Sequence, residues 1–454
     1  MFKKTFYLFT FSIMMATSFG QNKQDKQLEK SLDDLFSGQF SPSTPGCVVL
    51  VNRKGETIYK KAFGSANLEL NVPLKPDMVF NLASITKQFT AVAILQLAEQ
   101  GKLSLDDSLQ KFIPDYPSQG HAITIEHLLT HTSGIKDYLQ LEWTSPFPER
   151  WDFTPRQLID SFKTLPLSFS PGTQFLYSNS GYFLLGYIIE KVSGKSYQEY
   201  MQESLFRPLG LSHTCFDYQD RLIPGRVSGY RREDTSFSNI SYWSPSIEYA
   251  AGGILSNAED LVKWHQSLLA YQVIKKESLE KARTSYQLKD RKLTGYGYGW
   301  YLKDYNGIRS VEHQGGLPGF QTNEVYFPEE DVLIIMLSNN GNTNIDDLSV
   351  RTSSLVLNRN FQVDIPQPDS ILAKYTGVYR AVADPKRTMT LLIMNGRLAA
   401  KMSEQEIVPL LFRTETKFQF KNLLNADCEF IIENGKVVRF NAEQNGHYEW
   451  VKVQ

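Results

Sequence analysis

The amino-acid sequence predicts an α+β fold: an antiparallel sheet flanked by helices, with a helical region inserted in its middle, followed by a small all-β barrel domain. Three observations predict this arrangement. Strand-like sequence occurs near both ends of the first 360 residues, at Cys47–Val51 and Val332–Leu337. Helical segments and long loops rich in proline and glycine lie between them. Beyond residue 370 the chain changes to short strands with tight turns, a pattern typical of a barrel or sandwich.

Hydrophobic period and residue type predict the elements of the first part in chain order. Lys26–Phe36 has apolar residues at helical spacing, and Thr57–Phe63 forms a hairpin with the strand that starts at Cys47. Thr86–Gln100 is rich in Ala, Leu and Gln and is followed by Gly101, which predicts the clearest helix of the chain. The remaining predicted elements are helices over Tyr182–Val192, Tyr197–Phe206 and Ile345–Leu357 and strands over Tyr296–Lys303, Ser310–His313, Gln321–Phe327 and Val332–Leu337.

The second part is predicted to be a separate β domain. Residues 361–370 contain two prolines and few large apolar side chains, as a linker would. Beyond them, Asn395-Gly396 and Asn434-Gly435 join β-rich runs, and Asn-Gly between such runs is a strong hairpin signal. We therefore expect an N-terminal signal at 1–20, a main domain at 21–360, a linker at 361–370 and the β domain at 371–454.

The first twenty residues resemble a secretory signal. Lys3 and Lys4 precede a mostly apolar stretch that ends near Ala16, and small residues surround a cleavage position before Gln21. The stretch is shorter than the roughly 20 residues that span a bilayer. We expect cleavage, no stable membrane anchor, and a mature protein in the periplasm or outside the cell.

Composition narrows the classes of function. The chain has 454 residues, with 48 basic and 49 acidic side chains and a net charge of -1. A nucleic-acid-binding protein would show a basic excess, so no nucleic-acid partner is expected. Cys47, Cys215 and Cys428 are widely separated and lie in no Cys/His cluster, so neither a disulfide framework nor a structural zinc site is predicted. No metal or organic cofactor is expected.

The most informative stretch is Phe80-Asn-Leu-Ala-Ser84-Ile-Thr-Lys87. Ser84 stands at the start of the predicted helix, where free backbone N–H groups and the helix dipole favour negative charge. Lys87 is three residues further on, so the two side chains share one helix face. A lysine whose pKa is lowered by burial can remove the proton of an alcohol and make it a nucleophile.

Two further motifs follow in a fixed order. Tyr177-Ser178-Asn179 lies after a Pro-Gly turn and before a predicted helix, and His313-Gln314-Gly315 ends a predicted strand and runs into Gly316. The order S-x-x-K, Y-x-N, H-x-G resembles that of the serine β-lactamase and penicillin-binding protein superfamily, in its class C β-lactamase-like branch with DD-peptidases, D-aminopeptidases and esterases. The stretches around Leu128–Gly134, Ala250–Ile254 and Gly315–Phe320 strengthen the resemblance, which covers about Leu32 to Leu357.

This resemblance implies a role for each motif residue. Ser84 would attack the substrate carbonyl and form an acyl-enzyme, Lys87 and Tyr177 would share the proton transfer, and Asn179 would bind the substrate amide. His313 occupies a position where β-lactamases usually carry a lysine. The backbone N–H groups of Ser84 and Gly316, next to Gly315, would form the oxyanion hole. Whether Lys87 or Tyr177 is the acylation base stays open.

The resemblance also implies the chemistry. We expect an exported serine hydrolase with a transpeptidase-like fold and a C-terminal lipocalin-like domain. Its small-molecule or peptide substrate would be a D-amino-acid peptide, with peptidoglycan fragments among the candidates, or an ester. A β-lactamase is the alternative, and a penicillin-binding sensor that acylates once is an alternative of another class. An imidazole is mostly neutral at pH 7, so His313 predicts weak β-lactamase activity. The oligomeric state is not predicted.

Two other features have structural interpretations. His127 and His131 have a spacing that can bind zinc on a helix, but no glutamate lies between them as in H-E-x-x-H, and residues 130–134 are expected to form a loop, so structural roles with satisfied hydrogen bonds are expected. Tyr138, in the loop after Gly134, is a candidate for the rim of the cleft or for packing.

Overall fold

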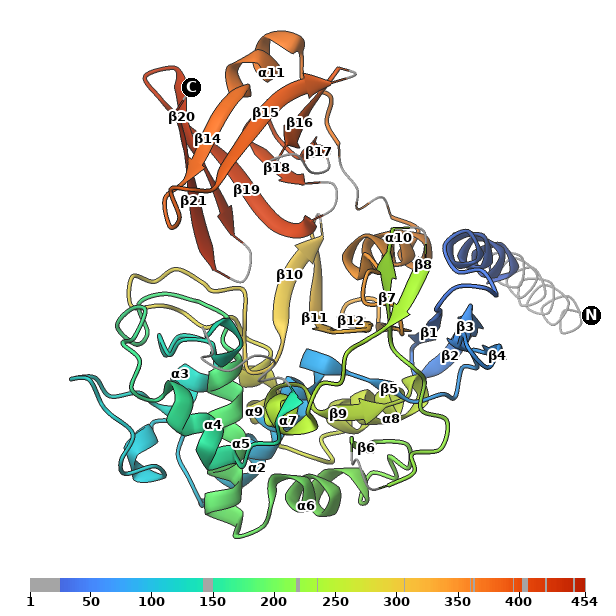
Figure 1. The fold of residues 1–454 in the computed structure, drawn as a ribbon, viewed down its shortest axis with the longest axis vertical. Coiled ribbons are helices and arrows are strands. Elements are labelled where there is room, and N and C mark those ends of the chain that lie inside the picture. Colours follow the sequence, from blue (N-terminus) through green and yellow to red (C-terminus); the bar gives the residue numbers. More distant parts are fainter. Residues whose placement is uncertain are drawn as a thin grey trace, which may run out of the picture.

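The structure is a computed structural model that describes residues 25–141, 150–217, 221–234, 236–305, 307–359, 361, 364–394, 396–401, 407–420, 423–443 and 446–453. These residues form a mixed α/β body and a closed C-terminal β-barrel, drawn above the body in Figure 1. The predicted signal peptide lies outside the described residues. Within the described ranges, no helix combines the length and the apolar character needed to cross a membrane.

A six-stranded antiparallel sheet forms the centre of the body, with the order β10-β11-β12-β13-β1-β2. β1 pairs with β13, so the first and last strands of the body are neighbours and the chain between β2 and β10 is an insertion. This confirms the predicted sheet with its inserted helical region. The strands are β1 (Cys47–Arg53), β2 (Glu56–Phe63), β10 (Tyr301–Tyr305), β11 (Ile308–Leu317), β12 (Phe320–Phe327) and β13 (Val332–Ser338).

Helices lie on both sides of this sheet. The helical residues 25–37 and α10 (Ile345–Leu357) belong to one core, and the inserted region forms the other. The inserted helices are α2 (Thr86–Glu99), α3 (Ile125–Leu129), α4 (Pro155–Phe162), α5 (Asn179–Ser193), α6 (Tyr197–Met201), α7 (Pro245–Gly252), α8 (Ala258–Leu269) and α9 (Lys276–Ala282), with single turns at Ala83–Ile85, Leu109–Lys111, Tyr138–Gln140 and Gln202–Phe206. The short strands are β3 (Ser65–Asn67), β4 (Val72–Pro73), β5 (Phe80–Asn81), β6 (Cys215–Phe216), β7 (Tyr230–Glu233), β8 (Ser236–Asn239) and β9 (Ile254–Ser256).

The continuous apolar run of β1 follows from its place in the middle of the sheet. Successive side chains of a strand point to opposite faces. Val49 and Val51 pack with Leu32 of the N-terminal helix and with α10, whereas Val48 and Leu50 pack in the core that contains α2 and α8. Both faces of β1 are therefore buried, which explains why its sequence does not alternate between apolar and polar residues.

The predicted strand Tyr296–Lys303 is wrong in its first half, because β10 begins only at Tyr301. Residues 296–300 form a loop that approaches α2. Gly299 has a φ of +86°, and a Cβ there would lie 2.9 Å from the carbonyl oxygen of Lys87. Gly297 is equally restricted, since its Cβ would lie 2.0 Å from the carbonyl oxygen of Ala282. The glycines thus allow a close approach and a turn that an extended strand does not provide.

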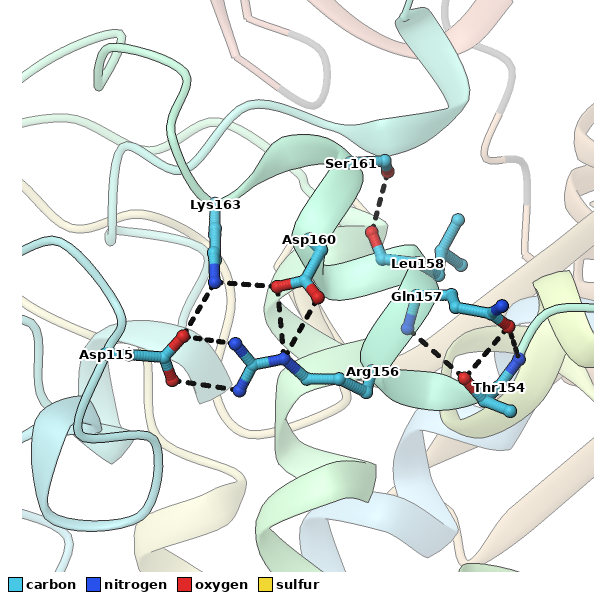
Figure 2. Close-up of polar contacts among 8 residues, drawn as sticks. All are labelled: Asp115, Thr154, Arg156, Gln157, Leu158, Asp160, Ser161 and Lys163. Carbon is cyan, nitrogen blue, oxygen red and sulfur yellow. Dashed lines mark hydrogen bonds and ion pairs between the residues drawn. The ribbon is translucent and has the colours of Figure 1, made fainter.

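Helix α4 is fixed by its first turn and by ion pairs (Figure 2). Thr154 and Gln157 form a reciprocal capping box, and Pro155 occupies the first turn, where a backbone N–H is not needed. Arg156 binds Asp115 through two nitrogen atoms. Lys163 also contacts Asp115, at 2.7 Å. The groups are partly exposed, so the network orients the helix more than it stabilises the fold.

The C-terminal residues form the predicted all-β barrel. β14 pairs with both β15 and β21, which closes the barrel. Its interior is rich in aromatic side chains, and the rings of Phe418 and Phe430 stack with centroids 4.4 Å apart. The elements are α11 (Asp369–Tyr375), β14 (Gly377–Ala381), β15 (Thr388–Met394), β16 (Arg397–Lys401), β17 (Ile407–Phe412), β18 (Lys417–Phe420), β19 (Leu423–Glu433), β20 (Lys436–Glu443) and β21 (His447–Lys452).

The barrel touches the body beside the segment that carries the Y-x-N motif. Leu411 of β17 is buried in the core formed by the terminal helices and β1. Gly446, between β20 and β21, lies against Leu176, with 3.1 Å between a Cβ built on the glycine and the leucine Cδ1. The hairpin β20–β21 therefore reaches the residue that precedes Tyr177.

Candidate active site

Ser84 lies in the helical turn that leads into α2. Ala83, directly before it, has a φ of +50°, a backbone conformation that is uncommon for a residue with a side chain. Hydrogen bonds hold this turn: the Ala83 N–H donates to Asn81 Oδ1 at 2.8 Å, and the Leu82 N–H donates to the Ile254 carbonyl at 2.9 Å. Contacts from β5 and β9 thus fix the position of Ser84 at the start of the helix.

Lys87 is fully buried, and its ammonium nitrogen lies 3.1 Å from Ser84 Oγ. It also donates to Asn179 Oδ1 and to the Ala251 carbonyl, both at 2.8 Å. Burial penalises the charged form and lowers the pKa of Lys87 to about 7, although the negative charge of Asp137 acts in the opposite direction. Near neutral pH, a fraction of Lys87 is therefore uncharged and able to accept the proton of the neighbouring hydroxyl.

Asn179 is the first residue of α5 and connects three parts of the site. Its Oδ1 accepts from Lys87, and its Nδ2 donates to Asp137 Oδ2 at 2.9 Å. The backbone N–H of Asn179 donates to the same carboxylate oxygen at 3.1 Å. Asp137 therefore fixes the amide so that its oxygen faces Lys87. It also supplies negative charge at the N-terminal end of α5, where the helix dipole favours it.

Tyr177 contacts Lys87 through its ring. The Lys87 nitrogen lies 4.7 Å from the centre of that ring, a favourable arrangement for a cation. Among the described residues, the buried Tyr177 hydroxyl makes no hydrogen bond within normal limits. Burial raises the pKa of Tyr177 well above its usual value, and the nearby Ser84 side chain lowers that pKa by a smaller amount. With its proton attached, this hydroxyl can donate to an atom that enters the site.

His131 and His127 have the structural roles that the sequence favoured. The His131 ring is buried and packs on Tyr177 with 4.2 Å between ring centres, while its Nδ1 accepts from the Ser178 N–H. His127 Nδ1 accepts from the Thr124 N–H and completes the cap of α3. His131 thus holds the Y-x-N segment in place by packing on Tyr177 and binding the Ser178 N–H.

His313 is buried in β11, and both of its ring nitrogens have partners. The Gln314 carbonyl lies 2.6 Å from Nδ1, so this nitrogen carries the proton, and Nε2 accepts from the Tyr296 hydroxyl at 3.0 Å. Burial, with a smaller contribution from the charge of Lys87, lowers the pKa of His313 to about 3. His313 is therefore a neutral imidazole at physiological pH.

The two glycines that follow His313 bring β11 close to the turn before Ser84. A Cβ on Gly315 would lie 2.3 Å from the Leu82 carbonyl oxygen, so no larger residue fits there without a backbone shift. Thr322 of β12 donates to the same oxygen at 2.8 Å. A Cβ on Gly316 would meet Gln321 Nε2 at 3.3 Å, a tight but much milder contact. The close approach at Gly315 places the C-terminal end of β11 next to the turn that carries Ser84.

A cavity of about 60 Å³ lies at this edge. Of the predicted site residues, Ser84, Asn179 and Gly316 line it. Lys87, Tyr177, His313 and Gly315 are not among its lining residues. Tyr138 lines it too, but it is buried and donates its hydroxyl proton to the Ile247 carbonyl, so this ring is a packed wall and not an exposed rim.

Three residues of the site were not predicted. Asp137 fixes Asn179, Asn81 holds the turn before Ser84, and Glu248 of α7 lines the cavity. Asn81 lies in the stretch Phe80–Lys87, Asp137 is next to Tyr138, and Glu248 is two residues before the stretch Ala250–Ile254. Nothing local distinguishes a buried Asp, Asn or Glu from a solvated one, so only the folded chain identifies them.

The fold and this site together define a class: a serine hydrolase of the penicillin-binding protein and β-lactamase superfamily, with a Ser–Lys pair at a helix start opposite the edge of an antiparallel sheet. The chain belongs to the Beta-lactamase family, whose sequence profile matches residues 26–356. This agrees with the extent of the resemblance seen in the sequence.

Individual relatives agree with the family. The chain is 30% identical over 459 aligned residues to Penicillin-binding protein 4* of Bacillus subtilis (strain 168). The alignment covers 94% of this chain and 98% of that protein. It is similar to the octameric penicillin-binding protein homologue from Pyrococcus abyssi, with a TM-score of 0.65, 26% identity, and coverage of 93% of this chain and 99% of that one. The D-amino acid amidase from Ochrobactrum anthropi SV3 shares the fold, with a TM-score of 0.64 and 22% identity over 74% of this chain and 99% of that one.

Proposed function

We propose that this serine hydrolase forms an acyl-enzyme through Ser84 and acts on small amides or esters of amino acids, with D-amino-acid peptides as the preferred class. The observation that carries the proposal is the 3.1 Å contact between Ser84 Oγ and the side-chain nitrogen of Lys87. Lys87 is buried, and its pKa of about 7 leaves part of it uncharged near neutral pH. The D-amino acid amidase among the structural neighbours and the penicillin-binding relatives support this choice of substrate class.

In the proposed reaction, neutral Lys87 removes the Ser84 proton as the oxygen attacks the substrate carbonyl. The backbone N–H groups of Ser84 and Gly316 donate hydrogen bonds to the carbonyl oxygen and stabilise the negative charge that develops on it. Collapse of the tetrahedral intermediate expels the amine or alcohol, which takes a proton from Lys87 or Tyr177. Water then attacks the carbonyl of the ester on Ser84 and gives a proton to Lys87 or Tyr177. The bond between the acyl carbon and Ser84 Oγ breaks, the carboxylic acid leaves, and Ser84 regains its proton from the same groups. Asn179 binds the substrate amide.

Export is part of the proposal. The basic start at Lys3 and Lys4 and the following apolar stretch support secretion of the mature enzyme, in keeping with a substrate outside the cytoplasm. Fractionation of cells followed by N-terminal sequencing tests this, and a chain retained uncleaved in the membrane would contradict it.

The rate of acylation is expected to rise with pH through about 7. Below that value Lys87 is protonated and cannot accept the Ser84 proton, so kcat/KM should fall about tenfold for each further pH unit. Above it the lysine is free and the rate should level off. The measurement is kcat/KM for p-nitrophenyl acetate between pH 5 and 9, corrected for spontaneous hydrolysis. A profile that is flat from pH 5.5 to 8.5 would contradict the base role of Lys87.

Peptides, amides and esters are expected to be better substrates than β-lactams. Neutral His313, with both nitrogens engaged, supports this order because it supplies no positive charge for a β-lactam carboxylate. Loss of one charge-assisted hydrogen bond lowers kcat/KM by about 10- to 100-fold. Turnover of nitrocefin should therefore be at least about tenfold below that of D-alanyl peptides and p-nitrophenyl acetate. Nitrocefin turnover above both would make the protein a β-lactamase.

A further inference from the structure

Part of the cavity wall is formed by α7, by Trp243 two residues before its start, and by the turn that carries Tyr138 and Leu139. Most of this wall is apolar or aromatic, as a pocket for a small organic group usually is. Among its lining residues, Glu248 alone carries a carboxyl group. The residues that line it beyond the predicted site are Ala83, Tyr138, Leu139, Trp243, Ile247, Glu248, Ala251, Gly252 and Leu317.

Glu248 is only 8% exposed. Its Oε2 accepts a hydrogen bond from Asn81 Nδ2 at 2.8 Å. No lysine or arginine within the described ranges forms an ion pair with it. A buried carboxylate without a cation is costly, so burial raises the pKa of Glu248 to about 8, and the charge of Asp217 adds to this. Packing alone therefore does not explain a carboxyl group at this position.

Glu248 is held in a fixed position relative to the nucleophile. Asn81 donates to it through Nδ2 and accepts from the Ala83 N–H through Oδ1. Ala83 is the residue directly before Ser84. The carboxyl of Glu248 is therefore connected to the backbone of the nucleophile turn through a single side chain, and both groups line one small cavity.

We propose that Glu248 is a specificity-determining residue that binds the free ammonium group of the substrate's acyl part, so that the enzyme favours amino-terminal residues over acylated ones. The inference rests on the proposed function of Ser84 and names its substrate class. In an amino acid, the ammonium nitrogen is two bonds from the scissile carbonyl carbon. A cavity lined by both Ser84 and Glu248 can hold the two groups of one residue.

The surroundings of Glu248 suit such a substrate. An incoming ammonium group supplies the cation that the carboxyl lacks, and the carboxyl releases its proton as the pair forms. The aromatic rings of Tyr138 and Trp243 form neighbouring walls, which also favour a cation. Ile247, Leu139 and Leu317 leave apolar surface for a small apolar side chain.

The test compares two substrates in the same enzyme preparation: D-alanine p-nitroanilide, which has a free ammonium group, and N-acetyl-D-alanine p-nitroanilide, which has none. The unaltered enzyme should favour the first. In Glu248→Gln the ratio of the two kcat/KM values should fall about 10- to 100-fold, because the neutral amide keeps the bond to Asn81 but loses the charge. The ratio does not depend on the amount of folded protein. Glu248→Asp should restore part of it.

A matched control separates binding from support of the nucleophile. Asn81→Ala removes both the bond that holds Ala83 and the bond to Glu248, but it keeps the carboxyl group itself, so both substrates should lose rate and the preference for the free ammonium group should be retained in part. If Glu248→Gln also lowers both rates alike, Glu248 is only a support for Asn81 and the inference is overturned. If the unaltered enzyme hydrolyses neither anilide nor any aryl ester, the proposed function of Ser84 fails, and this inference fails with it.

Discussion

Replacing Ser84 with alanine is expected to abolish hydrolysis of p-nitrophenyl acetate, with kcat lower by at least about 10³-fold. The reason is geometric: Ser84 carries the hydroxyl next to Lys87 at the edge of the cavity, and the acyl-enzyme cannot form without it. Steady-state kinetics on the purified full chain measure this effect. Loss of one hydroxyl from a partly exposed turn should leave the thermal midpoint nearly unchanged.

Ser178→Ala is the matched control for this experiment. Ser178 lies in the Y-x-N segment, and within the described chain its buried hydroxyl has no hydrogen-bond partner. Its removal should therefore change activity little. A Ser84→Ala enzyme that keeps more than about a tenth of its activity, when Ser178→Ala keeps nearly all, would show that another group is the nucleophile.

Replacing Lys87 with alanine is expected to lower the acylation rate by at least about 10²-fold, the loss typical of a missing general base. The lysine is the group whose nitrogen lies next to Ser84 Oγ and whose pKa is lowered by burial. The substitution also leaves Asn179 Oδ1 and the Ala251 carbonyl without their donor, so some loss of stability should accompany the loss of rate. Single-turnover acylation by p-nitrophenyl acetate, with unfolding followed in parallel, separates the two effects.

Tyr177→Phe serves as the comparison, because it removes a hydroxyl that has no hydrogen bond within normal limits among the described residues, and it keeps the ring that packs on Lys87. We expect it to lower the rate less than Lys87→Ala does. A loss in Tyr177→Phe that exceeds the loss in Lys87→Ala would move the base role to the tyrosine.

The local part of the site could be predicted from the sequence, because short-range geometry determines it. Ser84 and Lys87 lie one turn apart at a helix start, so their contact follows once the helix is predicted. The contact between Lys87 and Asn179 joins residues 92 positions apart. Only the order of the motifs and the family resemblance pointed to it.

Other features depend on tertiary structure that no local pattern reveals. The burial of Glu248 and the half-buried position of Asp137 arise from segments packed around them, and the same residues in a solvated loop would look identical in sequence. The aromatic residues of 296–300 favour a strand, whereas the close packing of Gly299 on α2 decides the conformation of this loop. The helix Ile345–Leu357 and the barrel hairpins were predicted correctly because period and Asn-Gly turns are local signals.

The central claim is that Ser84 becomes covalently acylated, and mass spectrometry tests it most directly. The full chain is incubated with a fluorophosphonate or a fluorescent penicillin, its intact mass is measured, and the modified peptide is sequenced. We expect one adduct per chain, located on Ser84, and no adduct on Ser84→Ala under the same conditions. An adduct on any other residue, or equal labelling of Ser84→Ala, would contradict the account.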